Sequence, residues 1–112
     1  MKILYIDDSV KWRSHFKELL EMVGGYAVEV ASSGEEGINK IKLGGYDLVI
    51  TDTQMGTISG LDVIRFVNSN YPNLKVILKS VMPFQEEAEK EGVLFYSLAM
   101  GLKSLLEMIS SL

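Results

Sequence analysis

Short hydrophobic runs alternate with helical patterns along the whole chain. Runs rich in Val, Ile, Leu and Tyr predict strands at residues 3–6, 27–31, 47–51, 75–79 and 93–98. Three of these runs are continuously apolar, which is typical of parallel strands that are covered on both faces. We therefore expect a buried parallel sheet between two layers of helices.

Between the strands, apolar residues recur with the period of an α-helix. Glycine and proline mark most of the helix ends, and Ser33 with Glu36 has the spacing of a capping box at the start of the second helix. The first predicted helix carries an apolar face over residues 12–23, and the second follows Ser33 and stops at Gly44. The third begins after Ser59 and Gly60 and stops before Pro72, the fourth starts at Pro83 and ends at Gly92, and the last carries an apolar face over residues 102–112.

Five β–α units in strict alternation predict an α/β fold with right-handed crossovers. For five strands we expect a flavodoxin-like (βα)5 arrangement, with a parallel sheet in the order 2-1-3-4-5 and helices on both faces. Residues 1–112 then form a single domain, with no output domain in this chain. A ligand site is expected at the carboxyl ends of the first and third strands, where the strand order switches.

Composition narrows the classes of function. The formal net charge is -4 and no basic run is present, which argues against nucleic-acid binding. The chain has no cysteine, so thiol catalysis and cysteine-based metal sites are excluded. No secretory signal or membrane span is recognisable in the sequence, and we expect a cytoplasmic protein.

Three carboxylates fall at the predicted ligand edge. Asp7 and Asp8 follow the first strand, and Asp52 follows the third. Clustered carboxylates repel one another unless a cation lies between them, and a hard cation with oxygen ligands such as Mg²⁺ suits them. Taken singly, each could be a helix cap or a turn residue. Their joint position at the ends of adjacent buried strands favours a metal and phosphoryl site.

Motifs along nearly the whole chain resemble the receiver domain of bacterial response regulators. The most specific is residues 47–55 (Asp-Leu-Val-Ile-Thr-Asp-Thr-Gln-Met) with the Gly-Leu pair at 60–61. Residues 3–8 (Ile-Leu-Tyr-Ile-Asp-Asp), residues 31–36 (Ala-Ser-Ser-Gly-Glu-Glu), residues 76–80 (Val-Ile-Leu-Lys-Ser) and Gly92 complete the pattern. The resemblance implies a flavodoxin-like fold and a role in two-component signalling.

By resemblance, Asp52 is the phosphoacceptor. The same resemblance makes Asp7, Asp8 and Asp52, with the backbone carbonyl of Gln54, the ligands of Mg²⁺. An aspartate carboxylate is a known nucleophile for phosphoryl groups, and Mg²⁺ neutralises charge during such a transfer. Such a protein is not an enzyme, beyond catalysing its own phosphorylation and dephosphorylation.

The resemblance also implies a switch and its partners. Ser80 matches the hydroxyl residue that binds the phosphoryl group, and Tyr96 matches the aromatic switch residue of the fifth strand. The expected partners are a sensor histidine kinase and a downstream protein that binds the face of the fourth helix, fifth strand and fifth helix. A homodimer through that face is a further expectation.

The sequence departs from the family where a lysine and a proline normally follow the fifth strand. Ala99 and Met100 stand there, so a charge-assisted contact to the phosphoryl group is missing. Strand alternation turns Lys79 away from the Ser80 side, which predicts a strand-end lysine that reaches solvent. Lys103 comes one helical turn too late, so neither lysine is expected to replace the missing charge.

Two smaller departures concern loops and the fourth helix. The segment between Ser80 and Gly92 is short for the family, and its helix has few apolar anchors. Gly56 replaces a proline usual in the loop after the phosphoacceptor, which predicts a looser loop.

These features support three hypotheses. The leading one is a Mg²⁺-dependent phosphoacceptor that is charged by a histidine kinase. The second is a phosphorylation-independent pseudo-receiver, an interaction or dimerisation module, which Ala99 and the short fourth helix favour. The third is a small-molecule enzyme that uses the carboxylates as acid and base, but the sequence shows no second set of converging polar groups.

Overall fold

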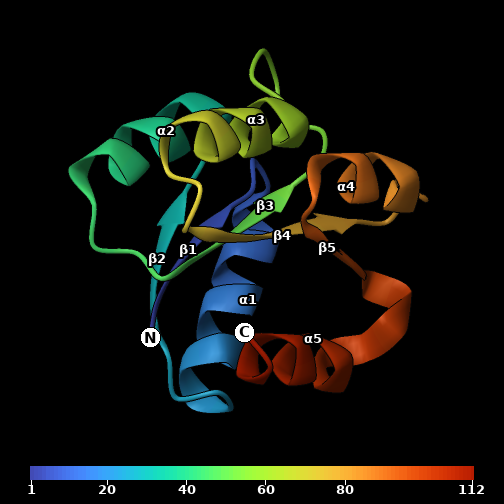
Figure 1. Cartoon of the computed structure of the whole chain (residues 1–112). Coiled ribbons are helices and arrows are strands. Elements are labelled where there is room, and N and C mark those ends of the chain that lie inside the picture. The colour runs from blue at the N-terminus through green and yellow to red at the C-terminus, as the bar shows by residue number, and fades with distance from the viewer.

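Five strands alternate with five helices over residues 1–112, all of which the computed structural model describes (Figure 1). The strands are β1 (Lys2–Ile6), β2 (Ala27–Ala31), β3 (Leu48–Asp52), β4 (Lys75–Ser80) and β5 (Leu94–Ser97). The helices are α1 (Val10–Met22), α2 (Gly34–Leu43), α3 (Gly60–Asn70), α4 (Gln85–Glu91) and α5 (Gly101–Ser110), with a 3-10 turn η1 (Leu98–Met100) before α5.

All strand pairs in the sheet are parallel. The order is β2-β1-β3-β4-β5, as expected for a five-stranded flavodoxin-like sheet. The carboxyl ends of β1, β3 and β4 therefore lie next to one another at one edge. In the register of the sheet, Asp52 on β3 lies opposite Lys79 on β4.

Helices cover both faces of the sheet, with α1 and α5 on one side and α2, α3 and α4 on the other (Figure 1). Successive strand residues point to opposite faces, so each face has its own buried cluster. Tyr5, Ile50 and Ile77 belong to the cluster under α1 and α5. Leu4, Val49 and Leu78 belong to the cluster under α2 and α3. None of the helices has the length and apolar character that crossing a bilayer requires.

Local hydrogen bonds shift several element ends from their predicted places. Asp47 precedes β3, where its carboxylate accepts the backbone N–H of Lys2. The Ser97 hydroxyl accepts the N–H of Ala99, which ends β5 and begins η1. Pro83 lies before α4, which begins at Gln85 and has no side-chain cap.

The predicted capping box of α2 forms only in part. The Ser33 hydroxyl accepts the N–H of Glu36, as a cap residue should. The Glu36 carboxylate, however, accepts from the backbone and hydroxyl of Ser32 instead of Ser33. The helix still begins where the sequence predicts, because one side-chain cap is enough to define its first turn.

Candidate functional site

Three carboxylates converge at the carboxyl edge of β1 and β3, as the sequence predicts. Asp7, Asp8 and Asp52 each present an oxygen, and these oxygens lie within 4.8 Å of one another. Asp7 is 1% exposed, Asp52 is partly buried and Asp8 is exposed to solvent. The group is therefore buried at one end and open at the other.

Asp7 is held in place by hydrogen bonds to both carboxylate oxygens. The backbone N–H of Ser9 donates to Oδ1 at 3.0 Å, and the Tyr5 hydroxyl donates to Oδ2 at 2.8 Å. Burial and the neighbouring Asp7 charge hold the pKa of Tyr5 above its usual range, so its hydroxyl keeps the proton that it donates. Arg13 donates to the Asp7 carbonyl at 2.8 Å. The Ser9 hydroxyl caps α1, so this segment serves as a helix cap and as part of the acidic group.

The prediction that Lys79 reaches solvent is wrong. Its side chain is 3% exposed, and its ammonium lies 2.7 Å from Asp7 Oδ2. It also donates to the Tyr5 hydroxyl at 2.8 Å. The ring centroids of Tyr5, Trp12 and Phe16 lie 5.5, 5.2 and 5.2 Å from the Lys79 nitrogen. A buried positive charge thus belongs to the acidic site.

Alternation correctly predicts the side of the sheet to which Lys79 points but not what covers it. The Lys79 side chain projects from the same face of the sheet as Ile77, opposite to Leu78, and α1 covers this end of that face. The rings of Trp12 and Phe16 lie beside the ammonium, and Asp7 pairs with its charge. A lysine in an otherwise apolar strand, one strand from two acidic strand ends, is the signal that could have indicated this ion pair.

The environment of Asp52 disfavours its charged form. Burial and the nearby Asp7 carboxylate raise the pKa of Asp52 to about 6, against the opposing effects of the Lys79 charge and the Thr53 backbone N–H. Binding of a cation, or formation of a bond to the carboxylate oxygen, would reduce the repulsion between Asp52 and Asp7 and is therefore favoured. Its position and its environment together distinguish Asp52 from an ordinary turn residue.

The loop after Asp52 is anchored to the sheet and to α3. The Thr53 hydroxyl, buried in the loop, donates to the Lys79 carbonyl at 3.0 Å, a contact that the sequence did not predict. Gly60 donates to the Thr53 carbonyl at 2.8 Å, and a Cβ at residue 60 would collide with the Asp52 carbonyl. Gln54, whose carbonyl we expect to bind metal, lies exposed in this loop. Gly56 has φ of 52°, a conformation closed to the proline usual in the family.

The side chains of Ser80 and Tyr96 project from opposite faces of the sheet. Ser80 is buried at the end of β4, where its hydroxyl accepts the N–H of Met82 at 3.0 Å. Tyr96 belongs to the cluster under α1 and α5, with its ring 6.5 Å from that of Phe16. In the sheet register Tyr96 lies opposite Lys79, and Ser80 lies opposite Ser97. The structure therefore places Tyr96 beside Lys79 and does not bring its ring to Ser80.

The turn that directly follows β5 carries no positive charge. Ala99 and Met100 belong to η1, and Met100 is 45% exposed. Lys103 is exposed on α5 and lines a surface hollow with Val23 and Tyr26, away from the carboxylates. The expectation that Lys103 does not replace the family lysine agrees with this position. The predicted short fourth helix is also present, since α4 has 7 residues and only Ala88 is buried.

The donor set fits a hard divalent cation. All three side chains offer carboxylate oxygen, which Mg²⁺ and Ca²⁺ prefer, and Asp8 leaves one side open to water. Lys79 already neutralises part of the charge of Asp7, which leaves Asp8 and Asp52 as the carboxylates with the greatest need of a cation. Mg²⁺, which keeps several water ligands, suits such a partly open site.

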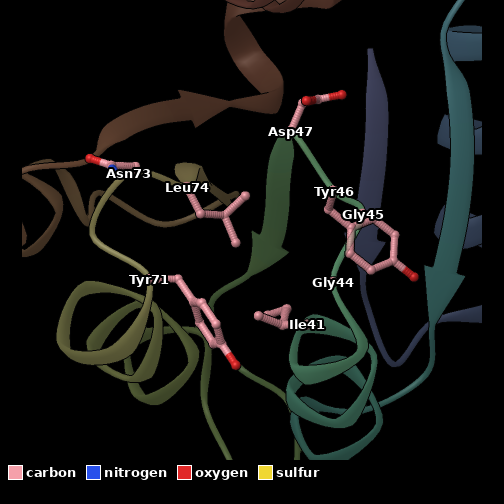
Figure 2. A pocket seen from close by; sticks show the side chains of 8 residues that line it. All are labelled: Ile41, Gly44, Gly45, Tyr46, Asp47, Tyr71, Asn73 and Leu74. Carbon is pink, nitrogen blue, oxygen red and sulfur yellow. The ribbon is translucent and has the colours of Figure 1, made fainter.

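The most enclosed pocket lies at the other edge of the sheet. Figure 2 shows it between the loop that leads from α2 into β3 and the loop that leads from α3 into β4. Its volume is about 370 Å³, and it is lined by Ile41, Gly44, Gly45, Tyr46, Asp47, Tyr71, Asn73 and Leu74. These loops precede the strands, so the pocket is separate from the carboxylates, which follow them.

Comparison with known proteins gives the family. The family model described as "Response regulator receiver domain" matches residues 3–94. The chain is 31% identical over 94 residues to chemotaxis protein CheY of Thermotoga maritima, covering 81% of this chain and 78% of that protein. It is 30% identical over 92 residues to protein-glutamate methylesterase/protein-glutamine glutaminase 3 of Rhodospirillum rubrum. That match covers 82% of this chain but only 25% of the esterase.

Solved structures agree with this match. The chain superposes with a TM-score of 0.91 on the response regulator TrrA of Thermotoga maritima in complex with Mg²⁺ and BeF, at 29% identity, covering 98% of this chain and 96% of the other. TrrA in complex with the histidine kinase ThkA gives a TM-score of 0.89 over the same shares of the two chains. A receiver domain from Clostridium thermocellum gives 0.90 at 31% identity, covering 98% and 91%. The chain belongs to the response-regulator receiver-domain family.

Proposed function

We propose that this receiver domain accepts a phosphoryl group on Asp52, in a Mg²⁺-dependent transfer from a sensor histidine kinase. The observation that carries the proposal is the group formed by Asp7, Asp8 and Asp52, whose oxygens lie within 4.8 Å of one another at the mouth between β1 and β3. The similar TrrA, in complex with Mg²⁺ and BeF in one structure and with a histidine kinase in another, supports the same function.

The side chains have distinct parts in the transfer. A carboxylate oxygen of Asp52 attacks phosphorus, the new P–O bond forms as the donor's bond to phosphorus breaks, and the bonding pair leaves with the donor. With acetyl phosphate the leaving group is acetate. Bound Mg²⁺, held by Asp8 and Asp52 with Asp7 and the Gln54 carbonyl, would neutralise charge on the phosphoryl oxygens. The hydrogen bonds that fix Asp7 keep this arrangement in place before the donor arrives.

We propose Ser80 as the hydroxyl that detects the phosphoryl group. Its present bond from the Met82 N–H ties it to the segment that leads into α4. A hydroxyl that turns toward a phosphoryl oxygen would release this bond and reposition that segment. Tyr96 stays our candidate switch aromatic, acting through its neighbour Lys79 rather than through contact with Ser80. The output partner, or a second copy of the domain, would bind the α4–β5–α5 face.

The pseudo-receiver alternative loses its main support in the structure. It was favoured by Ala99, which leaves the site without its usual lysine, and by the short fourth helix, which the structure retains. Lys79 brings an ammonium to the acidic group from β4. An acid–base enzyme is also disfavoured, because the most enclosed pocket lies at the opposite edge of the sheet. We further expect the domain to act in the cytoplasm, where a kinase can reach it.

Intact-mass spectrometry after incubation with acetyl phosphate tests the proposal. The wild-type protein with Mg²⁺ should gain one phosphoryl group, whereas wild type in EDTA and Asp52→Asn with Mg²⁺ should not. Asp47→Asn is a matched control, since Asp47 precedes β3 at the opposite edge, and this variant should be phosphorylated like wild type. Equal phosphorylation of Asp52→Asn and wild type would overturn the assignment.

A further inference from the structure

The acidic edge, formed by Asp7, Asp8 and Asp52 at the carboxyl ends of β1 and β3, contains one buried cation, Lys79. Its position follows from the sheet, because Asp52 and Lys79 are register partners on adjacent parallel strands. Partners in register point to the same face, so the Lys79 side chain extends over the side of the sheet from which Asp52 projects. Asp7 closes the group from β1.

The surroundings fix the ammonium in one place. Three aromatic rings surround the ammonium, with centroids 5.2–5.5 Å from its nitrogen, and the side chain is 3% exposed, so the ammonium has little room to move. An ammonium has three N–H donors. The Tyr5 hydroxyl and Asp7 Oδ2 take two of them. The third donor has no hydrogen-bond acceptor and is free for an incoming one.

Other cations near the site are used differently. The Arg13 guanidinium donates to the Asp7 carbonyl, on the main-chain side of that residue. Lys103 is exposed on α5 and has no part in the site. The place where the family carries its lysine holds Ala99, in a 3-10 turn with no charge.

From this geometry we infer that Lys79 supplies from β4 the positive charge that the family takes from a lysine after β5. Its free N–H donates to an oxygen of the phosphoryl group on Asp52. The inference rests on the proposed function and deepens it. It also explains how a receiver domain with Ala99 at this position can stabilise a phosphoryl group.

The same contacts make Lys79 a competitor of the metal. While Lys79 pairs with Asp7, the Asp7 carboxylate attracts a metal cation less strongly. Removal of the ammonium leaves Asp7 free to bind Mg²⁺. The same change removes the N–H that donates to the phosphoryl group. Lys79→Met should therefore strengthen the binding of Mg²⁺ and weaken the binding of beryllofluoride, a phosphoryl mimic. A variant that merely loosened the site would weaken both.

Trp12 gives a direct readout, because it is the single tryptophan and its ring lies 5.2 Å from the Lys79 nitrogen. Fluorescence titrations with Mg²⁺ alone, and then with beryllofluoride at saturating Mg²⁺, should show the two opposite shifts in Lys79→Met. We expect at least about a tenfold loss of beryllofluoride affinity, as for a charge-assisted contact. Lys103→Met is the matched control and should bind both ligands like wild type. The double variant Lys79→Met with Ala99→Lys should regain beryllofluoride binding.

The outcomes separate the inference from the proposed function. Wild-type protein that fails to bind beryllofluoride with Mg²⁺ contradicts the phosphoacceptor function itself. Wild-type binding with an unchanged affinity in Lys79→Met, or a parallel loss of both ligands, overturns only the role of Lys79.

A measurement on the wild-type protein covers the case in which Lys79→Met does not fold. The ¹⁵N resonance of the Lys79 ammonium should shift when beryllofluoride is added to the Mg²⁺-bound protein. The ammonium resonance of Lys103 should not change. An unshifted Lys79 resonance would overturn the inference.

Discussion

The acidic edge and the α4 segment differ in how firmly each is held. At the acidic edge, Asp7, Thr53 and Lys79 are buried, and each has a hydrogen-bond partner. The segment after β4 exposes Val81 and Met82, and it leads to a helix of 7 residues without a side-chain cap. One Glu87 oxygen on that helix is shielded from solvent and has no partner. Packing thus prepares the site that meets the phosphoryl group, whereas the segment expected to respond is weakly held.

This difference suits a switch. A site that stabilises a transferred charge works best when its groups are already oriented. An element that changes conformation must have a low free energy of local opening. The two regions meet at Ser80, which ends β4 and bonds the backbone of Met82. Variants on either side of Ser80 should therefore have different consequences, and the following experiments measure them.

The largest effect on stability is expected from Lys79→Met in EDTA. Removal of one partner of a buried ion pair leaves the Asp7 charge without compensation, at a cost of about 3–5 kcal/mol. Urea denaturation measures the loss, and Mg²⁺ should restore part of it. Lys103→Met should stay within about 0.5 kcal/mol of wild type. Equal unfolding midpoints for Lys79→Met and wild type would show that the acidic edge is not held by this pair.

A smaller loss is expected from Gly60→Ala, because the new methyl group meets the Asp52 carbonyl. Overpacking of this kind costs about 1–3 kcal/mol and displaces β3 from α3. Chemical denaturation gives the stability, and beryllofluoride affinity gives the effect on the site. Ser69→Ala, on the exposed side of the same helix, is the control and should be nearly neutral. A stable Gly60→Ala variant with normal affinity would mean that this close approach is unimportant.

Asp52→Asn should stabilise the metal-free protein. The folded pKa of Asp52, about 6, lies above the ordinary value, so the folded state binds the proton more strongly and loses stability as pH rises from about 4 to 6. With allowance for solvent, the variant should gain about 1–2 kcal/mol at pH 7 and almost nothing at pH 4. Denaturation of both proteins in EDTA across this range measures the difference. A gain that is the same at both pH values would contradict the charge repulsion.

The smallest effect on global stability is expected from Glu91→Ala. This change removes an ion pair to Arg65 on α3 that is partly exposed, which is worth about 0.2–1 kcal/mol. Its effect should be local, because Ala88 is the one buried residue of α4. Hydrogen exchange should become faster in α4 and stay unchanged in β1 and β3. Equal acceleration in all three elements would show that α4 and the acidic edge form one cooperative unit.

Much of the fold and site follows from local patterns in the sequence. Alternating apolar runs and helical periods predict a parallel α/β sheet, whereas its strand order was expected only as the common order for five strands. The strand-end position of Asp7, Asp8 and Asp52 predicts their convergence. Lys79 was misplaced because alternation gives the direction of a side chain but not the element that covers it. The partner of Thr53, 26 residues away, depends in the same way on tertiary packing that local pattern cannot show.

The most direct test of the account is a crystal structure of the protein with Mg²⁺ and beryllofluoride. We expect beryllium to be bonded to an Asp52 carboxylate oxygen and the metal to lie between Asp8 and Asp52. The Lys79 ammonium should lie within hydrogen-bond distance, about 2.7–3.2 Å, of a fluoride. The Ser80 hydroxyl should have left the Met82 N–H. A structure in which Asp52 carries no beryllofluoride, or in which Lys79 contacts only Tyr5 and Asp7, would contradict it.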